Sequence, residues 1–180
     1  MNLPNLITLS RLLSVPLTIW LILDNRFGAA FWTFVTAGIS DAVDGFIAKR
    51  FDSQTRLGAL LDPIADKSLL VGVYVTLGGS GHLPAWLVIL VVFRDLMIVG
   101  GFLLVQAMAQ AMRAEPLIVS KFNTVFQIAL AALTLAKLGL RLDAGLVIEI
   151  LIWCVAATTL LSGAAYLIRW TRALAGMEQA

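Results

Sequence analysis

The chain has 180 residues, of which 60% are hydrophobic and only 13% are charged. A soluble domain carries about 25% charged residues, and soluble helices need polar faces that this sequence lacks, so the composition excludes an ordinary soluble bundle and indicates an integral membrane protein. The formal net charge of +2, without a dense basic run, argues against nucleic acid as a partner.

Six apolar stretches are long enough to cross a bilayer, which takes about 20 mostly apolar residues. The connections between them are short, and there is no repeat or linker. We therefore predict one domain over residues 1–180 with an all-α fold, in which six transmembrane helices pack as a single bundle among membrane lipids. The predicted spans are 6–23, 29–49, 57–77, 84–108, 119–138 and 144–170.

Lysine and arginine near the span ends predict the orientation, because cytoplasmic loops carry an excess of these residues. Eight lie on the side of the N-terminus and three on the opposite side, so both termini are expected in the cytoplasm, with a bacterial inner membrane as the expected location. The eight are Arg11, Lys49, Arg50, Arg56, Arg113, Lys121, Arg169 and Arg172, and the three are Arg26, Lys137 and Arg141.

Four aspartates lie on the second and third predicted spans, near the cytoplasmic boundary. Asp41 and Asp44 are three residues apart and Asp62 and Asp66 are four apart, so each pair shares a helical face. A carboxylate at bilayer depth costs roughly 2.5–3.5 kcal/mol, so four of them need a compensating positive charge. Oxygen ligands without histidine or cysteine favour Mg²⁺, Mn²⁺ or Ca²⁺ over zinc, and two such ions can clamp a diphosphate.

Small residues keep the same helical faces open, and cations surround them. Gly58 precedes Asp62 by four residues, and a helical glycine costs about 1 kcal/mol relative to alanine, which indicates a close approach by a ligand or backbone. Two other interpretations remain: the carboxylates only pair with basic residues to hold helices together, or they mark the ion or proton path of a transporter. Besides Gly58, the small residues on these helical faces are Gly45 and Ala48, and the surrounding cations are Lys49, Arg50, Arg56 and Lys67.

This segment resembles the CDP-alcohol phosphotransferase family of membrane enzymes. The family pattern is D-x-x-D-G-x-x-A-R, eight residues, then G-x-x-x-D-x-x-x-D, and every spacing is kept from Asp41 to Asp66. Lys49 stands where the family has arginine, which keeps the charge but loses bidentate phosphate geometry. Six membrane helices also fit the family.

The resemblance implies that CDP-diacylglycerol donates its phosphatidyl group to an alcohol with release of CMP, at a site facing the cytoplasm. It implies two ions of Mg²⁺ or Mn²⁺, with Asp66 also the general base that takes the proton of the acceptor hydroxyl. The implied metal ligands are Asp41, Asp44, Asp62 and Asp66, and the implied nucleotide-binding residues are Asp41, Gly45, Ala48, Lys49 and Gly58.

Outside the motif, residues 4–11, 93–97 and 120–127 resemble the cardiolipin synthase branch. Phosphatidylglycerophosphate synthases are similar there too, but they typically carry a second arginine about seven residues after Arg94, where this chain has Gly100-Gly101. We therefore expect phosphatidylglycerol as the acceptor, with glycerol 3-phosphate as the alternative. The candidate ligands of the acceptor phosphate are Arg94, Lys121, Arg56 and Lys67.

Three points remain open at the level of sequence. Neighbours on a helix point in different directions, so we expect Arg94 to face an anionic head group rather than pair with Asp95, although a buried ion pair is the alternative. Lys121 either binds the acceptor or extends to the membrane interface. The oligomeric state is undetermined, with a homodimer as one option.

Overall fold

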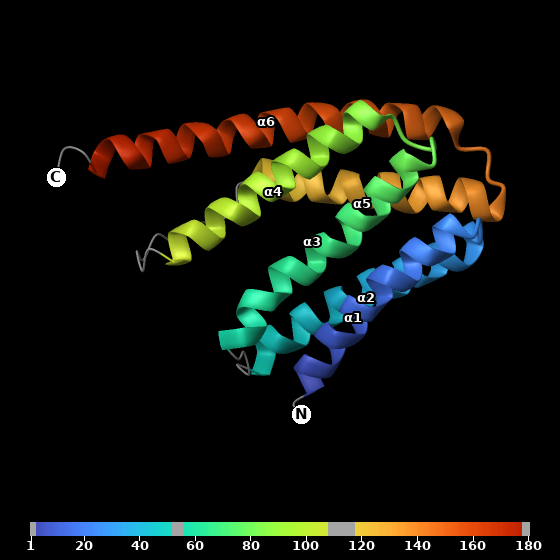
Figure 1. Cartoon of the computed structure of the whole chain (residues 1–180), viewed down its shortest axis with the longest axis horizontal. Helices are drawn as coiled ribbons and strands as arrows, with labels where there is room; N and C mark the ends of the chain where they lie inside the picture. The colour runs from blue at the N-terminus through green and yellow to red at the C-terminus, as the bar shows by residue number, and fades with distance from the viewer. Residues whose placement is uncertain (1–2, 52–55, 108–117, 178–180) are drawn as a thin grey trace.

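The protein is described by a computed structural model that covers the backbone of residues 3–51, 56–107 and 118–177, with side chains described within 12–40, 67–101 and 118–168. The described residues form six helices and no strand, which confirms the all-α prediction (Figure 1). The helices are α1 (Leu3–Leu23), α2 (Phe27–Phe51), α3 (Arg56–Gly79), α4 (Ala85–Ala107), α5 (Ile118–Leu140) and α6 (Gly145–Met177).

Consecutive helices run in alternating directions, and the described connections, which follow α1, α3 and α5, lie at the same end of the bundle (Figure 1). Helix α3 packs against α1, α4 and α5, and α5 packs against α2, α3 and α6. These two helices are therefore the centre of the bundle, and polar side chains on them can reach several neighbours. The buried polar network of the candidate site includes side chains from both α3 and α5.

Left-handed residues end three of the helices at the end of the bundle on the right of Figure 1. Asn25 has a φ of 58°, and the next N–H, that of Arg26, donates to the carbonyl of Leu21 at 2.8 Å, which is the Schellman cap of α1. Gly81, with a φ of 76°, has the same place after α3. Arg141 follows α5 with a φ of 56° although it has neither the freedom of glycine nor the tolerance of asparagine.

Glycine allows two pairs of helices to approach closely near this end. A Cβ at Gly139 of α5 would overlap the backbone of Phe27 and Gly28 in α2. A Cβ at Gly78 of α3 would lie 2.6 Å from Cγ2 of Val88 in α4. Such contacts between small residues and a facing backbone are typical of helix packing in membranes.

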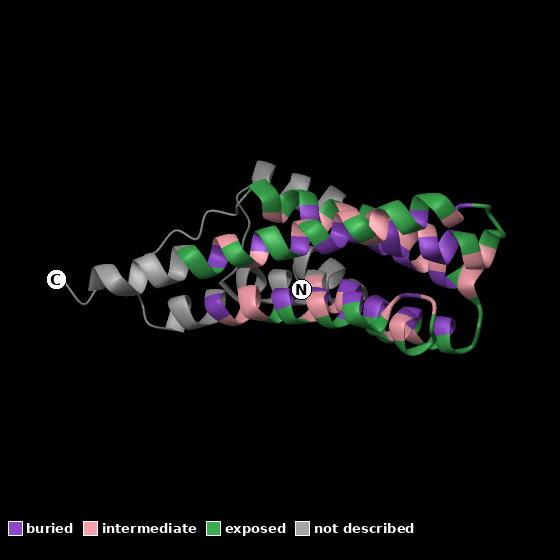
Figure 2. Ribbon diagram, turned by 90° about the horizontal axis from the view of Figure 1, so that it is seen from above, coloured by how far each residue is buried: buried purple, intermediate pink, exposed green. Residues whose placement is uncertain are grey.

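Many large apolar side chains of the described residues are exposed, whereas several polar and charged side chains are buried. Figure 2 marks the buried, intermediate and exposed positions along the helices. Large side chains on α6 face outward, with Leu146 73% exposed and Trp153 65% exposed. Apolar surface of this extent on a monomer marks contact with a membrane or a partner. Together with the apolar composition, it describes an integral membrane protein.

Among the described residues, two stretches are long and apolar enough to cross a membrane, judged by length and composition alone. They are Ile118–Leu140 and Gly145–Ile168. The described parts of α1, α2 and α3 contribute three further apolar stretches, Leu12–Leu23, Phe27–Ser40 and Lys67–Gly79. Six helices are thus confirmed, but six membrane spans are not.

Candidate active site

The acidic motif lies on two consecutive helices. Asp41 and Asp44 belong to the second half of α2, and Asp62 and Asp66 belong to the first half of α3. Helical backbone at both pairs confirms that the spacings of three and four residues are helical spacings. Their side chains lie outside the described residues, as do the side chains of Ala48, Lys49 and Arg56 and the surroundings of Gly45 and Gly58. The ligand set and the nucleotide site therefore remain predictions.

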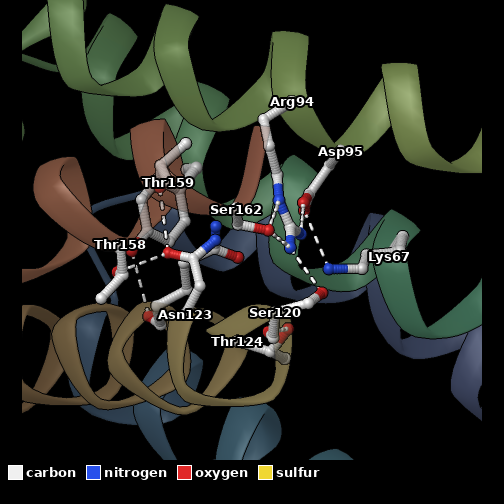
Figure 3. A network of polar contacts seen from close by, with 11 residues as sticks. Lys67, Arg94, Asp95, Ser120, Asn123, Thr124, Thr158, Thr159 and Ser162 are labelled. Atoms are coloured by element: carbon white, nitrogen blue, oxygen red, sulfur yellow. Dashed lines mark hydrogen bonds and ion pairs between the residues drawn. The ribbon is translucent and has the colours of Figure 1, made fainter. Parts of the chain in front are cut away.

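Arg94, in the middle of α4, is the centre of a buried polar network. The residue is 2% exposed, and its guanidinium reaches across to α5 and α6 (Figure 3). Nη2 donates to Ser120 Oγ at 2.5 Å and to Ser162 Oγ at 2.6 Å, and Nε donates to Ser162 Oγ at 3.2 Å. A buried charge is costly unless it is hydrogen-bonded, and these two serines meet that need for one side of the guanidinium.

Asp95 lies between two cations. Its Oδ1 accepts from Arg94 Nη1 at 2.7 Å, and its Oδ2 accepts from Lys67 Nζ at 3.1 Å. The carboxylate is 1% exposed, whereas the side chain of Lys67 is 23% exposed. Asp95 thus joins α3 to α4 and also holds the guanidinium in position.

The expectation that Arg94 would not pair with Asp95 is wrong. The argument considered only the directions of the two Cα–Cβ bonds, which differ for adjacent helical residues. The long arginine side chain brings its Nη1 to the neighbouring carboxylate inside the bundle, where the low dielectric constant strengthens the contact. Arg94 is buried in this arrangement, and its role as a ligand of the acceptor phosphate stays a prediction.

A second polar group lies on the same face of α5. Asn123 is fully buried, and its Oδ1 accepts from Thr158 Oγ1 at 2.9 Å and from Thr159 Oγ1 at 3.0 Å. Its Nδ2 has no partner among the described residues, and neither side-chain polar atom of Gln127 has one there. Ser120, Asn123 and Gln127 follow helical spacing, so a polar face of α5 runs inward from the network around Arg94.

Lys67 connects the described network to the acidic motif. It follows Asp66 directly in the chain, and its partially exposed side chain makes it the more accessible cation of the Arg94–Asp95 network. Lys121 follows Ser120, yet it is exposed and makes no ion pair or hydrogen bond with the described side chains. The structure therefore brings together two of the four predicted acceptor ligands, Lys67 and Arg94, and leaves Lys121 outside their network.

The described side chains contain no group of three or more histidines, cysteines, aspartates or glutamates that would hold a metal ion. The four motif aspartates, whose side chains lie outside that set, stay the predicted metal ligands. Four carboxylates at helical spacing match the hard-oxygen chemistry of Mg²⁺ and Mn²⁺.

Comparison with known proteins agrees with the motif. The family model of the CDP-alcohol phosphatidyltransferases matches residues 1–161. The chain belongs to this family. Enzymes of the family transfer the phosphatidyl part of a CDP-linked lipid, and they generally depend on a divalent metal. Membership favours the enzyme over the transporter interpretation of the four motif aspartates.

Individual relatives carry two different acceptor names. The chain is 35% identical to the rice chloroplastic CDP-diacylglycerol–glycerol-3-phosphate 3-phosphatidyltransferase 1, over 94% of the chain and 57% of that protein. It is 32% identical to the rat cardiolipin synthase (CMP-forming), over 92% of the chain and 60% of that protein. It is also 32% identical to the Aquifex aeolicus glycerol-3-phosphate enzyme, over 78% of the chain and 76% of that protein. The chain thus spans little more than half the length of the first two.

Proposed function

We propose that this phosphatidyltransferase makes cardiolipin by transferring the phosphatidyl group of CDP-diacylglycerol to phosphatidylglycerol. The observation that carries the proposal is the complete acidic motif on α2 and α3, followed directly by Lys67, whose Nζ belongs to a buried network with a small excess of positive charge. Residues 1–180 form a single six-span domain in this proposal, and the site opens toward the cytoplasm of a bacterial cell.

The roles of the motif residues follow from their chemistry. Asp41, Asp44, Asp62 and Asp66 hold two Mg²⁺ or Mn²⁺ ions, which when bound neutralise the charge of the donor diphosphate. Asp66 accepts the proton of the acceptor hydroxyl, whose oxygen forms the new bond to phosphorus as the bond to CMP breaks. The remaining nucleotide contacts come from the small residues of the motif, which are Gly45, Ala48 and Gly58, and from Lys49, which binds near the phosphates.

The acceptor choice depends on charge. The phosphodiester of phosphatidylglycerol has one negative charge, whereas the phosphate monoester of glycerol 3-phosphate has nearly two at pH 7, because its second pKa is about 6. Helix α4 has no cation from Leu96 to Ala107, so a dianion would meet few partners there. The acyl chains of phosphatidylglycerol also suit the apolar outer surface. Arg56 and Lys121 are further cations for head groups at the same end of the chain's helices.

Glycerol 3-phosphate is the second candidate, because relatives named for that acceptor match the chain as well as relatives named for cardiolipin. One experiment separates the two. Purified protein in detergent receives CDP-diacylglycerol with either phosphatidylglycerol or glycerol 3-phosphate, and CMP and lipid products are measured. We expect cardiolipin from the first mixture. Phosphatidylglycerol phosphate from the second, with phosphatidylglycerol ignored, would reverse the acceptor and retain the donor chemistry.

A further inference from the structure

Asp95 touches both cations of the buried network, yet neither the motif nor the proposed mechanism gives it a role. Its two carboxylate oxygens are divided between Arg94 on its own helix and Lys67 on α3. A carboxylate shared between two cations sets the charge that the network presents as a whole.

The network of Lys67, Arg94 and Asp95 contains two positive charges and one negative charge, so its net charge is +1. The motif aspartates are assigned to metal ions in the proposed function, on which this inference rests, and are not part of this sum. A single net positive charge inside a membrane protein is unfavourable unless an anion offsets it. One monoanionic phosphate would do so, whereas a dianion would leave one negative charge over.

The three residues differ in how far a ligand can reach them. The side chains of Arg94 and Asp95 are 3% and 1% exposed, and Lys67 is 23% exposed. An acceptor phosphate can therefore contact Lys67 Nζ directly, while Asp95 lies behind it. Asp95 orients that ammonium group and reduces its effective charge, because its carboxylate lies 3.1 Å from Nζ.

We propose that Asp95 is a positioning residue that sets acceptor specificity: by holding the network at a net charge of +1, it favours a phosphodiester head group over a phosphate monoester. The effect is a difference in affinity between two acceptors. The network attracts the phosphodiester, and the carboxylate of Asp95 repels the additional negative charge of the phosphate monoester. It acts on the acceptor and leaves the donor site unchanged.

Four proteins form a charge series that tests the proposal. Wild type has a network charge of +1, Asp95→Asn +2, Lys67→Gln 0, and the double variant +1 again. We expect Asp95→Asn to raise the ratio of kcat/KM for glycerol 3-phosphate over phosphatidylglycerol by about tenfold, the scale of one charge-assisted hydrogen bond. The double variant should return the ratio to within about threefold of wild type.

Two further variants separate charge from structure. Asp95→Glu keeps the charge, and Ser162→Ala removes one hydrogen-bond partner of Arg94 without changing the charge. Both should keep the wild-type ratio even if they lower the rate. Each protein is first checked by size exclusion in detergent. If Asp95→Asn does not fold, Lys67→Gln carries the test, because its network charge of 0 should lower the ratio.

The outcomes distinguish this inference from the proposed function. If wild type ignores phosphatidylglycerol, the proposed acceptor is wrong, but the KM for glycerol 3-phosphate still reports on Asp95 and should fall in Asp95→Asn. Equal loss of both acceptors in Asp95→Asn, an unchanged ratio there, or a tenfold change in Asp95→Glu or Ser162→Ala would each overturn the role given to Asp95.

Discussion

The phenol of Tyr74 on α3 donates a hydrogen bond of 3.1 Å to the main-chain carbonyl oxygen of Gln127 on α5. Both residues are fully buried, so this bond joins the two central helices inside the bundle. The oxygen belongs to a helical peptide group and can accept a second hydrogen bond with its other lone pair.

Removing that hydroxyl should have a small effect, and removing the ring a large one. We expect Tyr74→Phe to lose about 1 kcal/mol of stability, because the carbonyl keeps its helical partner. Tyr74→Ala should lose about 3–5 kcal/mol, because it leaves a cavity between α3 and its neighbours. Thermal unfolding in detergent measures both, and equal losses would show that the ring contributes nothing beyond its hydroxyl.

The contact between Gly78 and Val88 predicts a destabilisation that a second change can relieve. A Cβ at Gly78 would lie 2.6 Å from Val88 Cγ2, so Gly78→Ala should cost about 1–3 kcal/mol through overpacking. Adding Val88→Ala removes the clash and should recover part of that loss. Gly79→Ala is the matched control, since nothing lies within 4 Å of a Cβ there. The same melting temperature for both glycine variants would exclude this close packing of α3 on α4.

The two buried amides of α5 should respond differently to substitution. Gln127 has no side-chain partner among the described residues, so Gln127→Met removes unpaired polar atoms and should be neutral or stabilising. Asn123→Leu deletes the acceptor of both Thr158 and Thr159, and should cost about 1–3 kcal/mol. A clear loss in Gln127→Met would reveal an ordered water that pairs with the amide.

The proposed metal and base roles predict two separate losses of activity. Exhaustive chelation should abolish CMP release, and Mg²⁺ or Mn²⁺ should restore it. Asp66→Asn retains an oxygen ligand but removes the base, so turnover should be nearly lost while CDP-diacylglycerol still binds. Binding is followed by ligand-induced thermal shift. Activity that survives chelation would show that the reaction does not need the proposed metal ions. Turnover at the wild-type rate in Asp66→Asn would show that Asp66 is not the general base.

Periodic and compositional signals allowed much of the fold to be predicted. The predicted span 119–138 corresponds to α5 at Ile118–Leu140, because connections rich in polar and turn-forming residues bound each apolar stretch. Helix α6 extends to Met177, beyond the predicted end at residue 170, since hydropathy cannot detect a helix that continues past the apolar region. Length and composition likewise cannot decide how many of the six helices cross the membrane.

The polar interior was much less predictable. Four hydroxyl groups of this interior lie on apolar helices, where such groups commonly donate to a carbonyl of the preceding turn. The sequence therefore gives no sign that they have partners on other helices. They are Ser120, Thr158, Thr159 and Ser162. Asn123 and Gln127 gave a usable signal, because two amides four residues apart in an apolar span require internal partners. The pairing of Arg94 with Asp95 required knowing that both are buried, which the spacing of adjacent residues does not reveal.

The left-handed conformation of Arg141 offers a simple way to make the purified protein more stable. Asn25 and Gly81 occupy comparable positions after α1 and α3 with residues that tolerate a positive φ, whereas Arg141 bears a conformational strain of roughly 1–2 kcal/mol. Arg141→Asn should relieve much of it and lengthen the lifetime of the purified protein in detergent. The change removes one of the three cations predicted on the side opposite the termini, so in the predicted orientation it also strengthens the charge asymmetry that directs membrane insertion.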